Sequence, residues 1–313
     1  KLSEDRVKGY RNFLNKLWNA NNFLITNKCD FTNIEKAPQL TININKWINL
    51  ELLETKNKIE INLKNYRFDE AAKNAYQFAW HSYCDWYLEL SKTILFSEDE
   101  KAKDEIRQVS VYIFKQTLIL LHPFIPFVTE EIWLKNKFDN SSKDFLMLTN
   151  WPVGNGNKDS STNQVEKIIN IISGLRSFKN ELNVSPGSFI DISTEEISKN
   201  EKSFFVENEI ILKKLGRINN MFNKDQKKPA ATLMVSGDLF KVYFAEDVNL
   251  RLIKKNLITR QNRYKQEMNK ISQRLENKSF IDKAPKDIVD QEKNNYNNLN
   301  KDFERISITI KGL

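Results

Sequence analysis

The spacing of apolar residues predicts helices along most of the chain, and most clearly over residues 68–92. Apolar side chains recur there three and four positions apart from Phe68 to Leu90, and further alanines and aromatics widen that face. Polar positions form only a narrow stripe through Glu70, Asn74, Gln77, His81 and Asp85. A helix that is apolar over so much of its surface packs among other helices. We therefore expect a helical bundle with residues 68–92 at its centre.

Apolar periodicity also predicts the other helices of this bundle, over residues 3–27, 40–64, 97–121 and 127–137. Ser97 followed by Glu100 has the spacing of a capping box, which would begin the fourth helix. The proline after His122 ends that helix, because a residue before proline is disfavoured in helical geometry.

The first predicted helix, 3–27, has two contrasting faces. Its apolar stripe is Val7, Tyr10, Leu14, Leu17 and Leu24. The opposite face carries only amide and cationic donors, with no acid after Asp5: Lys8, Arg11, Asn12, Asn15, Lys16, Asn19 and Asn22. From the residues alone, an ordinary solvated face is favoured over a binding surface as the explanation of these donors.

A different pattern follows the linker-like residues 154–162. We expect a helix over 163–182, a strand over 189–193 and a second helix over 198–215. Residues 232–236 and 239–245 flank Gly237-Asp238, which predicts a β-hairpin. This middle part is predicted to be a small α/β domain.

The pattern changes again at residue 248, where apolar residues take a heptad-like spacing. One heptad segment runs from Leu250 to Leu275 and a second from Val289 to Leu313, with a proline-containing break over 279–285. Two such helices joined by a short loop form an antiparallel coiled-coil hairpin. The predicted fold is thus mainly α, with a helical bundle (1–153), a small α/β domain (154–247) and a coiled-coil arm (248–313).

Positive charge is concentrated in the predicted arm. The chain has a net charge of +8, and residues 248–313 hold 15 Lys and Arg against 8 Asp and Glu. Nine of these cations lie on the first helix of the arm, which has only Glu267 and Glu276 to oppose them. A localised excess of this kind indicates an anionic partner. Structured RNA fits this combination, because its phosphates bind Lys and Arg and its unstacked bases bind aromatic rings and amide groups.

Composition excludes several other classes of protein. Charged residues make up 29% and apolar residues 40%, which is ordinary for a globular protein in water. We expect no membrane span and no secretion, since the chain has neither a long apolar run nor a signal-peptide pattern. Cys29 and Cys84 are too few for a disulfide framework or a structural zinc site.

No catalytic constellation is found in the sequence. The phosphate-binding, dinucleotide-binding, nucleophile-elbow and zinc-protease motifs are all absent. His81 and Cys84 lie three apart on a predicted helix, but no second pair of ligands completes a metal site. We therefore expect the chain to bind rather than to catalyse, with no catalytic residue and no metal.

Several segments resemble the C-terminal part of bacterial valyl-tRNA synthetases, members of the class I aminoacyl-tRNA synthetases. They occur in the family's order and cover nearly the whole chain: KLSEDRVKGYRNFLNKLWNANNF (1–23), FAWHSYCDWYLELSK (78–92), LHPFIPFVTEEIW (121–133), LRSFKNELNVSPG (175–187) and NKSFIDKAPKDIVDQE (277–292). The first three are similar to the anticodon-binding domain of the synthetases for branched aliphatic amino acids. The last two are similar to the valyl enzymes, which close with a coiled-coil hairpin.

The resemblance implies the tRNA-binding portion of an enzyme that attaches valine to tRNA(Val) with ATP. The family's HIGH and KMSKS signatures and its editing domain would lie before Lys1, so we expect a fragment that cannot aminoacylate alone. ATP and Mg²⁺ would bind that missing catalytic core, and this chain would hold no cofactor. The implied partner is tRNA(Val), with no DNA and no membrane, and the implied state is a cytoplasmic monomer.

The resemblance also suggests which residues contact the tRNA. Lys16 would bond a base edge or phosphate of the anticodon and Phe23 would stack on a base. Other anticodon contacts would come from Asn12, Asn15, Asn19, Asp85 and Trp86, although packing is the favoured role for Trp86. The arm would contact the tRNA backbone and elbow through Arg251, Lys254, Lys255, Arg260, Arg263, Lys270, Arg274 and Lys278. The alternative is a coiled-coil scaffold protein with a helical head and no role with RNA.

Overall fold

A computed structural model describes most of the chain, and it groups the chain into two compact units, Lys1–Ile169 and Asn170–Leu313. The described residues are 3–32, 38–138, 145–154, 160–197, 199–223, 229, 231–235, 238–244, 250–277 and 286–312. Most of the predicted linker, the turn at Gly237, Lys278 and the loop 279–285 lie outside them. So does the predicted boundary between 247 and 248, and the division into three domains stays a prediction.

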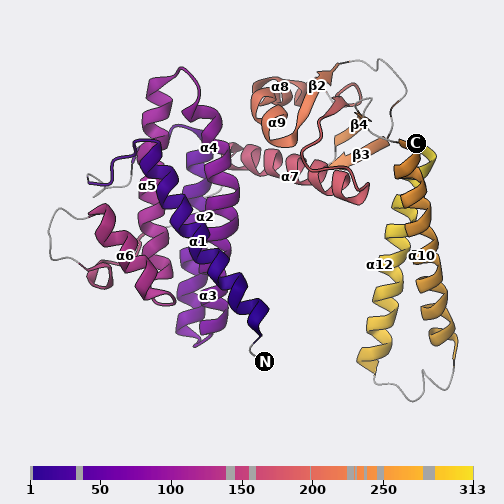
Figure 1. The fold of residues 1–313 in the computed structure, drawn as a ribbon, viewed down its shortest axis with the longest axis horizontal. Helices are drawn as coiled ribbons and strands as arrows, with labels where there is room; N and C mark the ends of the chain where they lie inside the picture. The colour runs from indigo at the N-terminus through magenta and orange to yellow at the C-terminus, as the bar shows by residue number, and fades with distance from the viewer. Residues whose placement is uncertain are drawn as a thin grey trace. The chain divides into compact units, whose positions relative to one another are not determined.

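The first unit is a helical bundle whose helices match the predicted ones closely (Figure 1). Its elements are α1 (Glu4–Thr26), α2 (Asn43–Lys64), α3 (Phe68–Gln77), the π-helix η1 (Phe78–Tyr87), α4 (Leu88–Leu95), α5 (Glu100–Leu121), α6 (Pro126–Asn136) and the short 3₁₀ turn η2 (Leu146–Leu148). The apolar periodicity therefore predicted each helix of the bundle to within a few residues.

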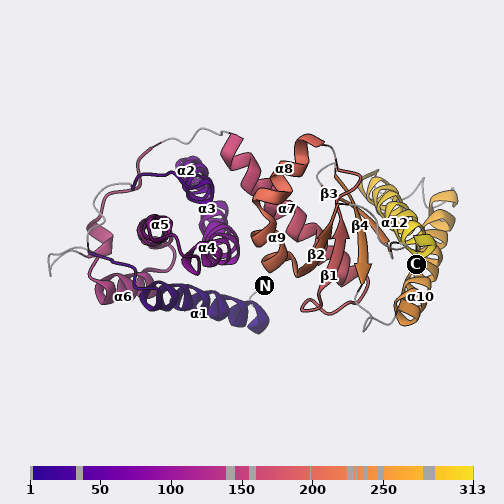
Figure 2. The same ribbon diagram turned by 90° about the horizontal axis from the view of Figure 1, so that it is seen from above.

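The centre of the bundle is α5, and the prediction that residues 68–92 occupy it was wrong. Figure 2 shows α5 end-on with the other helices arranged around it, and α5 contacts α1, α2, α3, α4 and α6. One whole side of the 68–95 helix is polar or half-exposed, and Phe68 is 57% exposed. The last turn of α5 is apolar all round, with Leu118, Leu120 and Leu121 buried.

The middle of the 68–95 helix is a π-helix rather than the predicted α-helix. The N–H of Leu88 bonds the carbonyl of Tyr83, five residues earlier, so each turn here holds an extra residue. Tyr83 and Tyr87 stack with ring centroids 5.8 Å apart, and both are fully buried. Their hydroxyls are satisfied: Tyr83 donates to the Ser110 carbonyl at 2.9 Å and Tyr87 donates to Asn45 Oδ1 at 2.8 Å.

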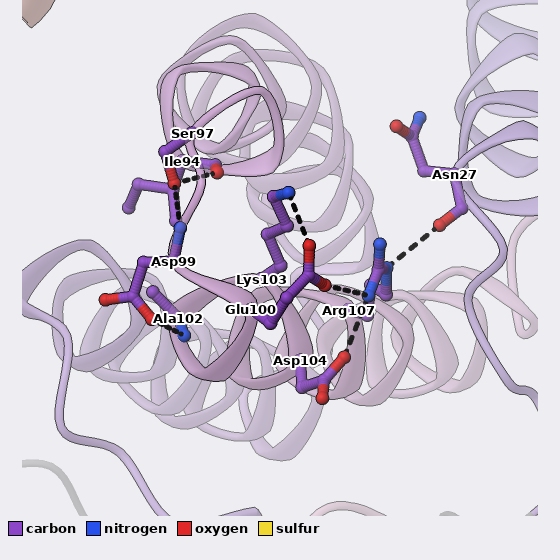
Figure 3. Close-up of polar contacts among 9 residues, drawn as sticks. All are labelled: Asn27, Ile94, Ser97, Asp99, Glu100, Ala102, Lys103, Asp104 and Arg107. Atoms are coloured by element: carbon purple, nitrogen blue, oxygen red, sulfur yellow. Dashed lines mark hydrogen bonds and ion pairs between the residues drawn. The ribbon is translucent and has the colours of Figure 1, made fainter.

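The start of α5 corrects the predicted capping box. Asp99, not Ser97, is the N-cap: its Oδ1 accepts from the Ala102 N–H at 3.0 Å (Figure 3). Ser97 instead donates to the Ile94 carbonyl and so closes the end of α4. Asp99 fits the role because a short carboxylate both accepts this bond and complements the positive end of the helix dipole.

Arg107 ties α5 to the end of α1. Its Nε donates to the Asn27 carbonyl at 3.2 Å, and its Nη1 lies 2.8 Å from Asp104 (Figure 3). The carbonyl of Asn27 follows the last turn of α1, where backbone acceptors have no partner inside the helix. This contact fixes the C-terminal end of α1 against the central helix.

Glu105, also on α5, caps the start of α2 from outside. Its carboxylate accepts from the N–H groups of Thr41 and Ile42, both at 2.9 Å, and from Asn45 Nδ2 at 2.8 Å. Burial would raise the pKa of Glu105, but these bonds outweigh it and the net pKa is lowered. Ile42, at the N-cap position of α2, has no side chain that can accept a hydrogen bond. The Glu105 carboxylate of α5 therefore serves as the acceptor at the start of α2.

The second unit contains a four-stranded sheet with the order β2-β1-β4-β3. Its elements after α7 (Ser160–Glu181) are β1 (Ile190–Ser193), α8 (Lys199–Glu207), α9 (Glu209–Gly216), β2 (Ile218–Phe222), β3 (Ala231–Val235) and β4 (Asp238–Phe244). Strands β3 and β4 pair antiparallel with Val235 opposite Asp238, as the predicted hairpin requires. Strand β1 pairs antiparallel with β4 and parallel with β2.

Two predictions for this unit were wrong. Residues 198–215 do not form one helix, because α8 ends at Glu207 and Asn208 bonds back to the Phe204 carbonyl before α9 begins. Strand β2 was not predicted at all. It is an edge strand whose Asn219 and Asn220 are both exposed, so it lacks the alternation of apolar and polar residues that identifies a half-buried strand.

Helix α7 packs closely on this sheet. Phe178 stacks on Phe244 with centroids 6.2 Å apart, and a Cβ at Gly174 would lie 2.6 Å from Val235 Cγ2. The helix ends in a Schellman motif around Asn183, which has a φ of 55°. The N–H of Val184 bonds the Lys179 carbonyl, and the N–H of Asn183 bonds the Asn180 carbonyl. Three carbonyls near the end of α7, those of Phe178, Lys179 and Asn180, are therefore satisfied by the turn itself.

A lysine is buried under this turn. Lys179 is only 2% exposed, and its Nζ donates to the carbonyls of Ser188 at 2.8 Å and Gly216 at 3.1 Å, with Arg217 at 3.5 Å. Burial, helped by the charges of Arg217 and Arg176, lowers the pKa of Lys179 from 10.5 to about 8. One ammonium group thus joins α7, the loop before β1 and the end of α9.

Helices α10 (Leu250–Glu276) and α12 (Lys286–Gly312) lie antiparallel, side by side, as predicted (Figure 1). We call this pair the arm. Ile253, Leu257, Val289 and Ile306 are buried along the seam, while the middle of the seam is only half-buried. Gln261 donates to Ser307 across the pair at 2.7 Å, and Arg274 pairs with Glu292 at 3.1 Å. Among the described residues, no helix is both long and apolar enough to cross a membrane.

Candidate nucleic-acid interface

One face of α1 carries most of the residues predicted to contact an anticodon. Asn12, Asn15, Lys16, Asn19 and Phe23 follow the spacing of three and four that places side chains on one side of a helix. The three asparagines are exposed, and Lys16 and Phe23 are half-buried. This face therefore presents amide groups to solvent along about two turns.

The buried face of α1 differs from the predicted apolar stripe. Val7 and Tyr10 are 53% and 63% exposed, whereas Phe13, Leu17 and Leu24 are buried. The bundle covers only the C-terminal two thirds of α1, so the first turns have no core to enter. The predicted donor face is nevertheless solvent-facing, as the pattern indicated.

Lys16 is held between two residues of η1. Its Nζ forms an ion pair with Asp85 and lies 4.3 Å from the centroid of the Trp80 ring. The Lys16 and Asp85 side chains are 27% and 38% exposed, so the pair is reachable from solvent. An ammonium over an indole gains a cation–π attraction as well as the ion pair. Lys16 is therefore fixed in position before any ligand arrives.

The aromatic support of Lys16 continues into the bundle. The ring of Trp80 stacks on Tyr76 with centroids 5.7 Å apart, and Phe13 lies 4.7 Å from Tyr76. Burial raises the pKa of Tyr76, and the nearby Tyr10 and Asp85 raise it further. Asp85 Oδ2 also lies 3.2 Å from His81 Nδ1, and it accepts a hydrogen bond from that nitrogen when the nitrogen carries the ring proton.

Phe23 lies at the other end of the same face. The Nζ of Lys92 is 5.5 Å from its ring centroid, and Lys92 is paired with Glu89 at 2.5 Å. The ring of Phe23 therefore has a cation beside it and is only partly covered. A half-exposed aromatic ring with a neighbouring cation is the combination on which an unstacked base can stack.

The structure thus pairs Lys16 with Asp85 and places Phe23 further along α1 beside Lys92, and it adds residues that were not predicted. Trp80, His81, Glu89 and Lys92 lie along the side of the 68–95 helix that contacts α1. Their spacing on that helix was visible in the sequence, but their pairing with α1 was not. Trp86 is half-buried and has contacts of its own within the protein, and its role stays a prediction.

Cys84 and His81 do not form a ligand pair. Cys84 is buried, and that burial raises the pKa of its thiol to about 12, whereas His81 lies at the exposed surface beside Asp85. Among the described residues, no group of three or more His, Cys, Asp or Glu is close enough to hold a metal ion.

The cations of α10 fall on two faces of the helix. Arg260, Arg263, Lys270 and Arg274 are separated by three, seven and four residues and share one face. Arg251, Lys254 and Lys255 share another face, on the first turns of the helix. All seven are exposed. Lys278, the last predicted contact, lies outside the described residues.

These two faces differ in how their charges are compensated. Arg263 pairs with Glu267 at 2.9 Å, Arg274 pairs with Glu292, and Arg260 Nε donates to the Tyr264 hydroxyl at 3.0 Å. Lys254 and Lys255 have no ion pair within the described part of the chain. The lysines are therefore free charges, and the arginines are partly oriented by neighbours.

Comparison with known proteins assigns both parts of the chain. Residues 45–197 match the family described as the anticodon-binding domain of tRNA ligase, and residues 253–313 match the valyl-tRNA synthetase tRNA binding arm. The whole chain is 81% identical to part of the valine–tRNA ligase of Pelagibacter ubique strain HTCC1062. The chain belongs to the valine–tRNA ligase family. The comparisons give no support to a scaffold protein without a role in tRNA binding.

Other members of the family are more distant. The chain is 31% identical over its full length to the valine–tRNA ligase of Bartonella quintana strain Toulouse, and 31% identical over 94% of its length to that of Agrobacterium fabrum strain C58. It spans about a third of these proteins, 36% of the Pelagibacter relative and 35% of the Bartonella one. The match to the anticodon-binding family extends past residue 153, the predicted end of the bundle domain.

Proposed function

We propose that this chain binds tRNA(Val), through its α1 face at the anticodon and through the arm at the tRNA elbow. The observation that carries the proposal is the α1 face itself, where Lys16 is held in place by Asp85 and Trp80, and Phe23 lies half-exposed beside Lys92. The likeness to an anticodon-binding domain and to a tRNA binding arm supports it.

Each part of this face has a role suited to unstacked bases. Phe23 offers a surface for one base to stack, a sequence-tolerant contact that favours single-stranded loops. Lys16 donates to a base edge or a phosphate, and Asp85 can accept from the exocyclic amine of cytosine or adenine. Asn12, Asn15 and Asn19 supply paired donors and acceptors, and Trp86 lies on η1 one residue after Asp85.

Recognition at this face requires the tRNA to replace contacts that already exist. The Lys16–Asp85 pair is partly exposed, so opening it costs on the order of 1 kcal/mol or less. A base that bonds both groups would replace the pair without leaving either charge unmatched. The face is thereby selective for a partner with a donor and an acceptor side by side, as a base edge has.

We propose that the arm contributes affinity rather than anticodon specificity. Its first helix spans 27 residues, or about 40 Å, with cations along two faces. Lysine and arginine contacts to phosphates carry no sequence information. The assigned contacts are Arg251, Lys254, Lys255, Arg260, Arg263, Lys270, Arg274 and Lys278.

In this proposal the chain is part of an enzyme that joins valine to tRNA in an ATP-dependent reaction. ATP and Mg²⁺ are used by the catalytic core of that enzyme, and the residues of this chain position the tRNA and do not touch the reacting atoms. We propose further that the protein acts in the cytoplasm as a monomer, with bundle, α/β and arm domains divided near residues 153 and 247.

The experiment that tests the proposal is binding of the 313-residue chain to tRNA(Val) transcripts and to transcripts that differ only in the anticodon. Fluorescence anisotropy at several salt concentrations gives both the affinity and its salt dependence. We expect tighter binding to the valine anticodon and a log–log salt slope of several units. Equal affinity for all anticodons would exclude the α1 face as the anticodon site.

A further inference from the structure

The turn after α7 contains Asn183, whose backbone is held by hydrogen bonds and whose side-chain amide makes none within the described residues. The Schellman motif keeps the backbone of Asn183 in the left-handed region, and Lys179 anchors the same turn from below. The Asn183 side chain is exposed and makes no hydrogen bond within the described residues. Asparagine is tolerated there because its short polar chain adopts this conformation more readily than most residues.

Asn183 lies across a cleft from the basic face of α10. The cleft has a volume of about 550 Å³ and is lined by Asn183, Asn256, Thr259, Arg260, Arg263 and Tyr264. None of these lining residues is acidic. The amide of Asn256, like that of Asn183, makes no hydrogen bond within the described part of the chain. The cleft is therefore lined by two guanidinium groups and by two side-chain amides that make no hydrogen bond within the described residues.

The hydrogen bonds and the ion pair that Arg260 and Arg263 already make leave other donors of the cleft available to bind an anion. Because Arg260 Nε donates to the Tyr264 hydroxyl, the hydroxyl proton of Tyr264 is free to be donated outward. Arg263 is held by Glu267 through Nε, which leaves its terminal nitrogens as donors. The carbonyls of Lys179 and Asn180 at the end of α7, which would repel an anion, already accept the two Schellman hydrogen bonds.

We propose that this cleft binds one backbone phosphate of the tRNA, held between Asn183 on the α/β part and Arg260 and Arg263 on the arm. The proposal rests on the proposed function and deepens it, because it places one phosphate where two parts of the second unit meet. A phosphodiester matches the set of donors: it accepts bidentate bonds from arginine and single bonds from amides and a phenol. Bound there, the RNA fixes the arm against α7.

The test uses substitutions that leave the fold and the rest of the arm intact. Asn183→Gly removes the amide and suits the left-handed backbone, and Asn183→Asp places a negative charge in the cleft at the same conformation. The matched control is Asn297→Asp. Asn297 is an exposed residue of α12 that does not line the cleft, so this substitution makes the same charge change elsewhere on the arm. Tyr264→Phe removes one hydroxyl and no charge. Each is titrated with the tRNA(Val) transcript at one salt concentration.

We expect Asn183→Asp to weaken tRNA binding by about tenfold or more, and Asn183→Gly and Tyr264→Phe by a few-fold each. Asn297→Asp should stay within about twofold of the parent chain. Ethylation interference should reveal one phosphate whose modification weakens binding to the parent chain, and weakens binding to Asn183→Gly by a smaller factor because that variant has one donor fewer.

Equal affinities for Asn183→Asp and Asn297→Asp would overturn the proposal, and they would leave the proposed function standing as long as the parent chain still discriminates anticodons. Loss of tRNA binding by the parent chain itself would instead defeat the proposed function. Inorganic phosphate, titrated at constant ionic strength, separates a free anion from RNA. Saturable phosphate binding that Asn183→Asp abolishes while tRNA affinity is unchanged would overturn the assignment to the tRNA.

Discussion

Replacing Lys179 by methionine removes the only ammonium group described beneath the α7 turn and tests how strongly burial perturbs it. In the folded chain the pKa of Lys179 is lowered from 10.5 to about 8. Between these two pH values the unfolded chain keeps a proton that the folded chain has released. The free energy of unfolding of the second unit therefore rises with pH across this window.

The size of the effect follows from the same two values. A shift of one pKa unit corresponds to about 1.4 kcal/mol, so the full effect approaches about 3.5 kcal/mol, with about 2.5 kcal/mol present by pH 10. Below pH 8 the lysine is charged in both states and contributes no pH dependence. Methionine has no proton to release, so the parent chain should gain about this much stability relative to Lys179→Met between pH 7 and pH 10.

Urea titrations of both proteins at the two pH values measure this difference. Far-UV circular dichroism follows the whole chain, whereas tryptophan fluorescence follows the bundle alone, because all six tryptophans lie in the first unit: Trp18, Trp47, Trp80, Trp86, Trp133 and Trp151. The fluorescence transition is thus an internal control that the substitution should not move. A difference between the two proteins that is the same at pH 7 and pH 10 would refute a perturbed lysine.

Three further predictions concern tRNA binding and catalysis. Phe23→Ala should weaken binding to the cognate tRNA by about 1–3 kcal/mol, the cost of a lost base stack, with little change in Tm by circular dichroism; a large fall in Tm would show a core role. Joint Lys254→Gln and Lys255→Gln should lower the salt slope by roughly 0.7–0.9 per phosphate contact without altering anticodon preference. Valine-dependent pyrophosphate exchange by this chain should stay at background, and measurable exchange would contradict a purely binding role.

Most helices were predictable here because they have a long apolar face with a period close to 3.6; the exception is 198–215, which forms the two short helices α8 and α9. The bounds of α10 and α12 follow directly from their heptad spacing. Strand β2 escaped prediction because its two exposed asparagines hide its pairing with β1, which is a long-range contact. Ser97 and Asp99 are both good caps two residues apart, and the choice between them depends on where α4 ends.

The candidate site was predictable only in part, for the same reason. The donor face of α1 is a local pattern and could be seen in the sequence. The pairing of Lys16 with Asp85 joins residues 69 apart, and the contact of Lys92 with Phe23 depends on how two helices pack. The π-helix was hidden because residues 78–87 are apolar almost all round, so their spacing is compatible with either helix type.

The π-helical stretch makes the register of the 68–95 helix sensitive to the length of the chain. An α-helix turns by about 100° per residue, so loss of a single residue that converted η1 toward α geometry would rotate everything after it relative to what lies before. Lys92 and Glu89 would then swing away from Phe23 while Trp80 kept its place beside Lys16. Length in this stretch is therefore constrained independently of residue identity, and relatives should tolerate substitutions there far better than insertions or deletions.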